Sequence, residues 1–504
     1  MKLAEENGAK ASTRIEDRSY YQTLRSTFIM GGSSVMNILL GIVRNKVLAI
    51  LVNPSGMGLM GVYQSISNLA LTVSGMGVNE SGTRQVALAF KTGNVSSISH
   101  TSLLLRRIAF ITGVGGMALM LILSNRISSL TFHNREHAFD IALLSLSILF
   151  GTISGAQVAI IQGARKIRYL AKINVLGPFL GTVLSLPIIY FLRIRGIASY
   201  LIIMALTNVV TSWWYSKKIT IPEAKASWRK LLIDARPLMG LGIALMMGTL
   251  IIFGTSYLLR ILIIGHLGLD AAGQFQASSL LSTVYVGILF KAMGADFYPR
   301  LSALSMNDKE SCNLVNEQIE AGLLLAVPGV LFTLTFAPMV LIILYSNDFL
   351  PAINILRWQI LGVLLQVVTW PMGYILRAKS SGGLFITTEL YSSVCYIAAT
   401  WVGIKYIGLA GIGIAYFTYN VLYFVLIYRI VHRKYAFSFI SKSYKALMIA
   451  LIATAAAFLL AYLIPRYYLP LNIIIIIMAS IYSYRQLDFS KWVARIINSL
   501  KRKD

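Results

Sequence analysis

The sequence predicts an all-α membrane protein of about 14 transmembrane helices, arranged as two six-helix lobes with two extra C-terminal helices. Three observations lead to this prediction. The 504-residue chain is 57% hydrophobic and only 13% charged, whereas soluble domains carry roughly 25% charged residues. Its apolar residues are gathered in segments of roughly 20 residues, the length of a membrane-spanning helix. Its two halves also resemble each other at one fixed sequence offset.

Fourteen segments have the length and composition of a membrane span. They lie near residues 26–51, 57–80, 106–124, 139–163, 170–192, 196–216, 237–263, 272–297, 318–345, 351–376, 383–404, 408–428, 446–464 and 469–484. The short connections leave no room for a sizeable soluble domain. The predicted organisation is a cytoplasmic segment 1–25, a first lobe 26–216, a linker 217–236, a second lobe 237–430, two further spans within 431–485 and a basic tail 486–504.

The positions of Lys and Arg predict the orientation of these spans. If the N-terminus is cytoplasmic, the cytoplasmic segments hold 35 of the 45 basic residues, the opposite loops hold six and the spans hold four. Both termini are therefore expected in the cytoplasm, and the net charge of +26 reflects the positive-inside rule rather than a nucleic-acid interface. The first 25 residues lack the apolar core of a signal peptide, so the first span is expected to be an uncleaved anchor.

An internal repeat at an offset of 212 residues relates spans 1–6 to spans 7–12. Small and polar residues recur at this offset, including the pairs Gly56 and Gly268, Gly61 and Gly273, Gln64 and Gln276, Arg165 and Arg377, and Asn208 and Asn420. Because six spans are an even number, both halves enter the membrane from the same side, which predicts a pseudo-twofold axis along the membrane normal. This arrangement is typical of transporters, and duplication without transport is the alternative.

Three segments, 31–70, 162–174 and 375–389, carry a resemblance to a known family. They resemble the polysaccharide transporter family of O-antigen-type flippases, within the multidrug/oligosaccharidyl-lipid/polysaccharide exporter superfamily. The most specific is GGSSVMNILLGIVRNKVLAILVNPSGMGLMGVYQSISNLA at 31–70. The resemblance implies two lobes around a central cavity, alternating access, a polyprenyl-pyrophosphate-linked oligosaccharide as cargo and the bacterial inner membrane. In some members the extra helix pair lines a groove for the lipid tail.

Polar residues inside the spans are candidates for binding the cargo. A charge at the centre of a span costs about 2.5–3.5 kcal/mol on insertion scales, so it normally faces a cavity or a partner. The first-span pattern Gly41-x-x-Arg44 resembles that of the more distant lipid II flippase branch, which implies a cavity-lining Arg44. A guanidinium can bond two phosphate oxygens, and snorkelling to headgroups is the alternative. The expected substrate-binding residues are Asn37, Arg44, Gln64, Arg260, Gln276 and Arg357.

Two pairs of opposite charges occupy equivalent places at the cytoplasmic ends of spans 2 and 8. These are Glu80 with Arg84, and Asp296 with Arg300, each spaced i, i+4. Each pair is either a local helix ion pair worth roughly 0.2–0.5 kcal/mol or half of a cytoplasmic gate. In the gate hypothesis, Glu80 meets Arg300 and Asp296 meets Arg84 when the lobes close.

Glu389 is the carboxylate that lies well inside a predicted span, away from its ends. It is expected either to bind a coupling proton or sodium ion, or to pair with Arg377 or Lys379. Arg165, Arg377 and Lys379 cap spans 4 and 10 on the cytoplasmic side. They are candidates for capturing the anionic headgroup, although the positive-inside rule alone accounts for such charges.

The sequence contains no recognisable catalytic or metal-binding motif. The two cysteines, Cys312 and Cys395, are expected to be reduced thiols, and no cofactor or metal is expected. An enzyme is therefore disfavoured. A cation-antiporting multidrug exporter of the same superfamily is the main alternative, and a non-transporting membrane scaffold is the second. The expected partners are the lipid-linked oligosaccharide and membrane lipids, with polysaccharide polymerase machinery as a further candidate; the chain is expected to be a monomer that binds no nucleic acid.

Overall fold

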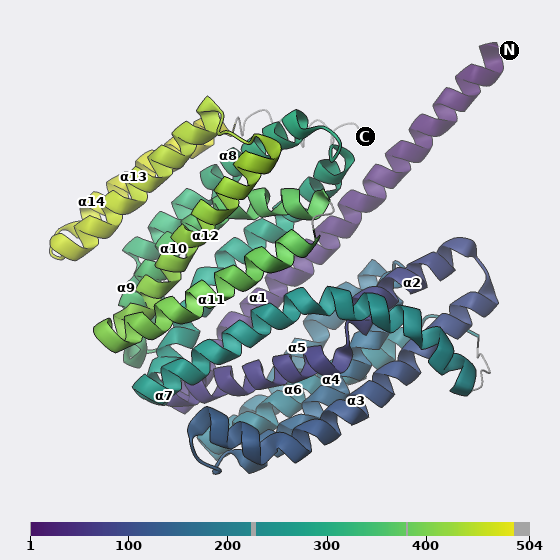
Figure 1. Ribbon diagram of the computed structural model, residues 1–504, viewed down its shortest axis with the longest axis horizontal. Coiled ribbons are helices and arrows are strands. Elements are labelled where there is room, and N and C mark those ends of the chain that lie inside the picture. Colours follow the sequence, from purple (N-terminus) through teal and green to yellow (C-terminus); the bar gives the residue numbers. More distant parts are fainter. Residues whose placement is uncertain (1, 223–227, 380–381, 488–504) are drawn as a thin grey trace. The chain divides into compact units, whose positions relative to one another are not determined.

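The computed structural model describes residues 2–222, 228–379 and 382–487; the side chains of 2–28, 228–238, 241, 244, 245, 285, 292, 295, 296 and 382 lie outside the description. This part of the chain contains fourteen α-helices and no strand, which confirms the predicted fold class. The helices are α1 Lys2–Gly75, α2 Val78–Thr92, α3 Val95–Phe132, α4 Ala138–Gly163, α5 Ile167–Leu192, α6 Ile197–Lys217, α7 Trp228–Ala303, α8 Asp308–Thr335, α9 Ala337–Leu344, α10 Ala352–Ala378, α11 Gly382–Ile407, α12 Leu409–Tyr435, α13 Ser441–Leu463 and α14 Tyr468–Gln486 (Figure 1).

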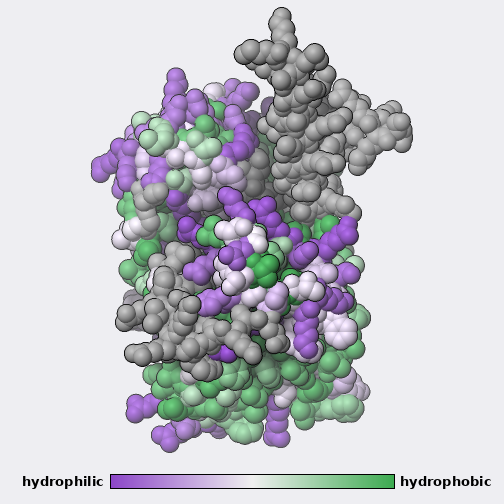
Figure 2. Space-filling view, turned by 90° about the vertical axis from the view of Figure 1, so that its right-hand side faces the viewer, coloured by the Kyte–Doolittle hydropathy of each residue, from purple (hydrophilic) through white to green (hydrophobic). Residues whose placement is uncertain are grey.

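Ten stretches within the described ranges are long and apolar enough to cross a membrane. Three of them, of 46 to 51 residues, have room for two crossings each. Large apolar side chains are exposed on these helices, as on Ile122 of α3 and Phe191 of α5, which are 76% and 79% accessible. Figure 2 shows such side chains gathered in broad areas of one face. A surface of this kind needs lipid around it, and the chain is a multi-pass membrane protein.

The two longest helices, α1 and α7, each join two predicted spans through a single non-helical residue. In α1 this residue is Asn53 (φ 57°, ψ −176°), which precedes Pro54. In α7 it is Gly268 (φ 82°, ψ −179°). Positive φ is readily adopted by glycine and tolerated by asparagine, and proline cannot continue the hydrogen bonding of the preceding turn. The sequence predicted loops at 52–56 and 264–271, and the structure reduces each connection to one residue.

The chain forms two compact units. Unit 1 comprises Met1–Val52 and Val62–Tyr257, and unit 2 comprises Asn53–Gly61 and Leu258–Asp504. This division differs from the predicted linker at 217–236, because the first part of α7 groups with unit 1. Tyr257 of α7, for example, is hydrogen-bonded to Thr131 of α3, with 2.7 Å between the hydroxyl oxygens.

The packing within each unit follows one pattern. In unit 1, α3 packs on α4, and α4 and α5 both pack on α6. In unit 2, α8 packs on α10, and α10 and α11 both pack on α12. These contacts join helices that correspond at the 212-residue offset, so the internal repeat of the sequence is also a repeat of helix packing. The helices α13 and α14 lie side by side (Figure 1) and both pack on α8.

One predicted span ends earlier than expected. Span 2 was predicted to run to residue 80, but α1 ends at Gly75 and α2 begins at Val78. Gly77 between them has φ 63°, and a Cβ there would lie 1.9 Å from the carbonyl oxygen of Gly242 in α7. The break therefore exists where α7 packs directly on the backbone of the turn, an approach that glycine permits.

Candidate functional site

Unit 2 contains a cavity of about 220 Å³ among α7, α10, α11 and α12. We call it the unit-2 cavity and define it by six of its lining residues: Gln366, Trp370, Tyr374, Arg377, Glu389 and Tyr423. Five of these side chains come from α10 and α11, and Tyr423 comes from α12. The cavity thus lies where three repeat-related helices of unit 2 meet, and its lining combines charged, amide and aromatic groups.

The polar side of the unit-2 cavity is organised around Glu389. The hydroxyl of Tyr423 donates a hydrogen bond to Glu389 Oε1 over 3.3 Å. Gln366 donates from Nε2 to the Tyr419 hydroxyl over 3.2 Å. The Arg377 guanidinium lines the same cavity and lies over the Phe385 ring, 4.0 Å from its centre. Two residues that the sequence singled out, Arg377 and Glu389, are therefore brought to one site.

Part of the cavity lining is aromatic. Trp370 stacks on Phe290 of α7, with ring centres 4.9 Å apart and planes 4° from parallel. It also contacts Tyr374, one turn further along α10, at 4.4 Å between ring centres. These residues could not be identified from the sequence, because an aromatic residue in an apolar span cannot be told from a core residue by its pattern.

Arg260 and Gln276 form a second predicted cluster in unit 2. The Arg260 guanidinium donates a hydrogen bond to Gln276 Oε1 and lies 5.6 Å from the centre of the Phe275 ring. Gln276 is 4% exposed. A Cβ on Gly61 would approach Gln276 Oε1 to 2.7 Å, so this glycine makes room for the amide. The structure brings the two predicted binding residues together, with the glutamine holding the arginine in place.

Arg44 lies half-buried on α1 in unit 1 and has no partner for one of its donors. Its Nε is buried without a hydrogen-bond partner in the protein. The positive charge of Arg44 interacts electrostatically with the phenol of Tyr200, which is 4% exposed. Asn37, two turns earlier on α1, is half-buried, and Gln64 is exposed. Arg44 is thus a cation inside a predicted span with a donor left for a ligand.

Arg357 points into a different pocket from Arg260. This pocket, of about 320 Å³, lies among α10, α12 and α13 and is lined by Trp358 and Phe458 beside Arg357. The guanidinium lies over the Tyr468 ring of α14, 5.6 Å from its centre. Arg357 therefore faces the two extra helices, α13 and α14.

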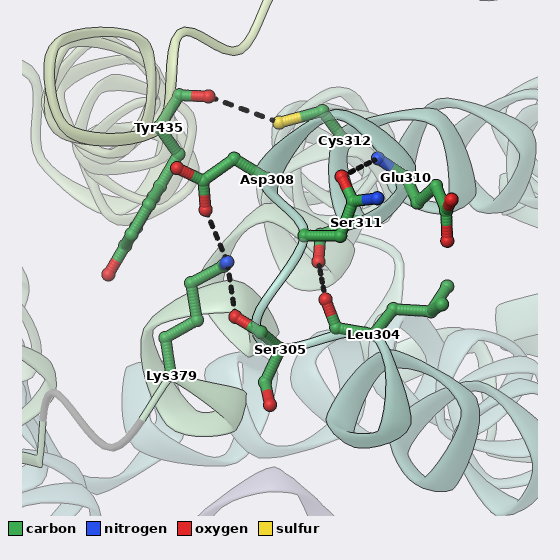
Figure 3. Close-up of polar contacts among 9 residues, drawn as sticks. Leu304, Ser305, Asp308, Glu310, Ser311, Cys312, Lys379 and Tyr435 are labelled. Carbon is green, nitrogen blue, oxygen red and sulfur yellow. Dashed lines mark hydrogen bonds and ion pairs between the residues drawn. The ribbon is translucent and has the colours of Figure 1, made fainter.

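Lys379 already has partners at the C-terminal end of α10. Its ammonium donates to the Asp308 carboxylate and to the Ser305 carbonyl oxygen, and its side chain is 9% exposed (Figure 3). The same close-up shows the Cys312 thiol of α8 directed at the Tyr435 carbonyl oxygen, with 3.5 Å between sulfur and oxygen. Cys312 is a free cysteine that forms no disulfide. Lys379 thus ties α10 to the start of α8 rather than presenting a charge to a ligand. Arg165, by contrast, is exposed.

The predicted gate residues lie in the first half of α2 and in the last turns of α7. The side chains of Glu80 and Arg84 are exposed on α2, and that of Arg300 is exposed on α7. Asp296 falls on α7, but its side chain lies outside the described residues. Glu80 also lines a cavity of about 230 Å³ in unit 1, together with Thr72 and Thr249.

A polar cluster that the sequence analysis missed links α1 to the start of α4. The Tyr63 hydroxyl, fully buried, donates to Asp140 Oδ2 over 2.8 Å and lies 2.9 Å from His137 Nδ1. His137 is outside the predicted spans, and burial lowers the pKa of its imidazole, while the charges of Asp140 and Glu136 act in the opposite direction. The sequence offered one hint of this cluster, which is that Tyr63 corresponds to Phe275 at the 212-residue offset of the repeat.

The model of one protein family, described as polysaccharide biosynthesis protein, matches residues 47–354. The lipid III flippases of Escherichia coli (strain K12) and Shigella flexneri are each 25% identical to the chain over 421 residues, which is 78% of this chain and 94% of theirs. Among solved structures, an inward-facing multidrug resistance MATE family transporter of the MOP superfamily has a TM-score of 0.68 at 15% identity, over 81% of this chain and 98% of that one. A lipid II flippase in an inward closed conformation has a TM-score of 0.65 at 13% identity, over 91% and 99%.

Proposed function

Since the chain belongs to the polysaccharide biosynthesis protein family, we propose that it is a flippase that moves a polyprenyl-pyrophosphate-linked oligosaccharide across the bacterial inner membrane by alternating access. The cargo would be an O-antigen unit or a related polysaccharide repeat unit. The likeness to lipid III flippases over most of both chains supports a lipid-linked cargo. The fold shared with transporters of the MOP superfamily supports movement between two lobes.

The observation that carries this proposal is the unpartnered donor of Arg44. Leaving a buried guanidinium nitrogen without a partner costs free energy, and a charged group in a membrane span costs more. An anionic ligand that visits this position would remove that cost. A pyrophosphate fits, because a guanidinium binds phosphate oxygens in pairs and remains charged at any physiological pH. Arg260, which is hydrogen-bonded to Gln276, would supply a second cation. Asn37 and Gln64 would supply polar contacts.

Each of the remaining predicted residues can be assigned to a step of a transport cycle. Arg165 and Arg377 would capture the headgroup at the cytoplasmic side; we leave Lys379 out of this step because its ammonium is paired with Asp308. Glu80, Arg84, Asp296 and Arg300 would form the cytoplasmic gate. Protonation or sodium binding at Glu389 would couple transport to an ion gradient. In this proposal both termini are cytoplasmic, the flippase acts as a monomer, and polysaccharide polymerase machinery takes over the product.

One observation favours a second candidate function, multidrug export. The carboxylate of Glu389 lies in a cavity with aromatic walls, and cationic aromatic drugs favour such surroundings. Arg377 lines the same cavity, however, and its positive charge opposes the binding of a cation. We therefore place the multidrug exporter second.

Depletion of the protein in the bacterium that encodes it separates the two candidates. For a flippase, we expect lipid-linked oligosaccharide to accumulate on the inner face of the membrane. The measurement is the fraction of the glycan that a lectin reaches in intact spheroplasts, compared with lysed ones. An unchanged lectin-accessible fraction, with increased sensitivity to cationic dyes, would instead identify an exporter of cations.

A further inference from the structure

We propose that the unit-2 cavity is a subsite for one neutral sugar ring of the cargo, with Trp370 as its stacking platform and Glu389 as an acceptor for ring hydroxyls. This inference rests on the proposed flippase function and adds to it a place where the saccharide itself is recognised. The pyrophosphate would bind the arginines, and the sugar would bind here.

Several lining residues of this cavity have counterparts of a different kind in unit 1. At the 212-residue offset, Glu389 corresponds to Gly177, Trp370 to Val158 and Tyr423 to Thr211. In unit 1 a Cβ on Gly177 would lie 2.3 Å from Asn208 Oδ1, so α5 and α6 touch at this place. Their counterparts α11 and α12 instead carry a carboxylate and a phenol that line a cavity. At this place the repeat-related helices pack closely in unit 1 and line a cavity in unit 2.

The dimensions of the cavity match an organic ring better than an ion. A volume of about 220 Å³ is several times the roughly 30 Å³ that one water molecule occupies in the liquid. A bare cation needs several oxygen ligands that converge on one point. The Glu389 carboxylate has one described oxygen neighbour, the Tyr423 hydroxyl at 3.3 Å, which already donates to it.

The chemistry of the lining matches a sugar. A pyranose has apolar C–H faces and a rim of hydroxyl groups, so it is bound by an aromatic ring on one side and by amide and carboxylate groups around the edge. Trp370 and Tyr374 supply the aromatic surface, and Gln366 and Glu389 supply the polar edge. Arg377 lines the cavity with a charge opposite to that of Glu389, so the lining favours a neutral ring over a cation.

The test is transport in proteoliposomes of lipid-linked oligosaccharide extracted from the bacterium that encodes the protein. For Trp370→Ala we expect KM to rise at least about fivefold, since base–aromatic stacking of comparable area is worth about 1–3 kcal/mol. Trp401→Ala is the matched control, because Trp401 lies on α11, does not line the cavity and is 46% exposed. Its KM should stay as in wild type.

A second probe, polyprenyl pyrophosphate without sugar, separates the sugar subsite from the pyrophosphate site. Its inhibition constant should be the same in wild type and Trp370→Ala, since it lacks the group that Trp370 binds. Trp370→Phe, which keeps an aromatic face, should recover part of the lost affinity, and an unfolding midpoint within error of wild type for both variants shows that the fold is intact.

Three results would overturn the inference. An unchanged KM in Trp370→Ala, with active wild-type protein, removes the sugar subsite and leaves the flippase function standing. An unchanged KM in Glu389→Gln, whether or not transport still follows the ion gradient, removes Glu389 as the acceptor for ring hydroxyls. No transport of lipid-linked oligosaccharide by the wild type refutes the proposed function itself.

Discussion

The Tyr63 hydroxyl contacts two titratable side chains of unit 1, and the residue that corresponds to Tyr63 in unit 2 has no hydroxyl to make such contacts. Tyr63 contacts Asp140 and His137, whereas Phe275, its counterpart, has no hydroxyl and lies beneath Arg260. A phenylalanine at position 63 would therefore fit the fold and remove only the polar contacts.

We predict that Tyr63→Phe destabilises the protein by about 1–3 kcal/mol, the cost of leaving a buried polar partner unsatisfied. The measurement is the free energy of unfolding of unit 1 in detergent. Tyr190→Phe, at a site 58% exposed, is the control and should have no effect. Equal stability of both variants would show that the cluster contributes nothing to the fold.

The pKa of His137 gives this cluster a defined pH dependence. Burial lowers the pKa of the folded imidazole below the ordinary value of about 6.5, so the folded state takes up a proton less readily than the unfolded state. The contribution to stability is present above the ordinary pKa and is lost as pH falls from it toward the lowered value. Wild type should thus lose stability between pH 7.5 and pH 5, and His137→Gln should lose less. An identical pH profile for both would contradict the assignment.

At the scale of helices, two glycines allow the kinked segments of α1 and α7 to meet within unit 2. A Cβ on Gly273 would lie 1.9 Å from the Pro54 carbonyl oxygen, and one on Gly58 would lie 2.2 Å from that of Leu269. Backbone atoms cannot yield as a flexible side chain can, so these contacts depend on glycine.

We predict that Gly273→Ala destabilises the protein by about 1–3 kcal/mol through overpacking. Gly287→Ala, on the same helix with no atom within 4 Å of the added Cβ, is the matched control. It should be neutral or slightly stabilising, because alanine favours helix. The yield of folded monomer in size-exclusion chromatography is the measurement. Equal yields for the two variants would contradict the close backbone approach.

The helices themselves could be predicted from the sequence, and their connections could not. Runs of roughly 20 apolar residues identify spans without reference to the rest of the fold. The one-residue kinks at Asn53 and Gly268 were missed because a positive φ is not visible in a pattern of hydropathy. The break at Gly77 depends on Gly242, which lies 165 residues away in the sequence.

The same distinction holds for the candidate site. Glu389 and Arg44 could be identified from the sequence because a charge in a span is costly. In the structure Glu389 lines a cavity, and the Nε of Arg44 is buried without a hydrogen-bond partner. Trp370 and Tyr423 did not stand out, since aromatic residues are common in spans. The contacts of Tyr63 with His137 and Asp140 join residues 74 and 77 positions apart, and only the folded chain brings them together.

At the scale of the whole molecule, the proposed gate makes a prediction that a local ion pair does not. Arg84→Asp should lower transport, and adding Asp296→Arg should restore it, because the gate pairs these two positions. If Glu80→Arg restores transport instead, the pair is the local one on α2. Transport rates in proteoliposomes, at equal protein content, decide between the two.

The proposed function depends most directly on a cation inside a membrane span that binds the pyrophosphate. The decisive measurement is translocation of a polyprenyl-pyrophosphate-linked oligosaccharide in proteoliposomes by wild type, Arg44→Ala and Arg195→Ala. The last variant changes an exposed arginine in the short 3-10 helix between α5 and α6 of unit 1. Hydrogen bonds to charged groups are worth about 1.5–3 kcal/mol, so we predict a rate at least about tenfold lower for Arg44→Ala and unchanged for Arg195→Ala. Equal rates for all three proteins, or no translocation by wild type, would contradict the proposal.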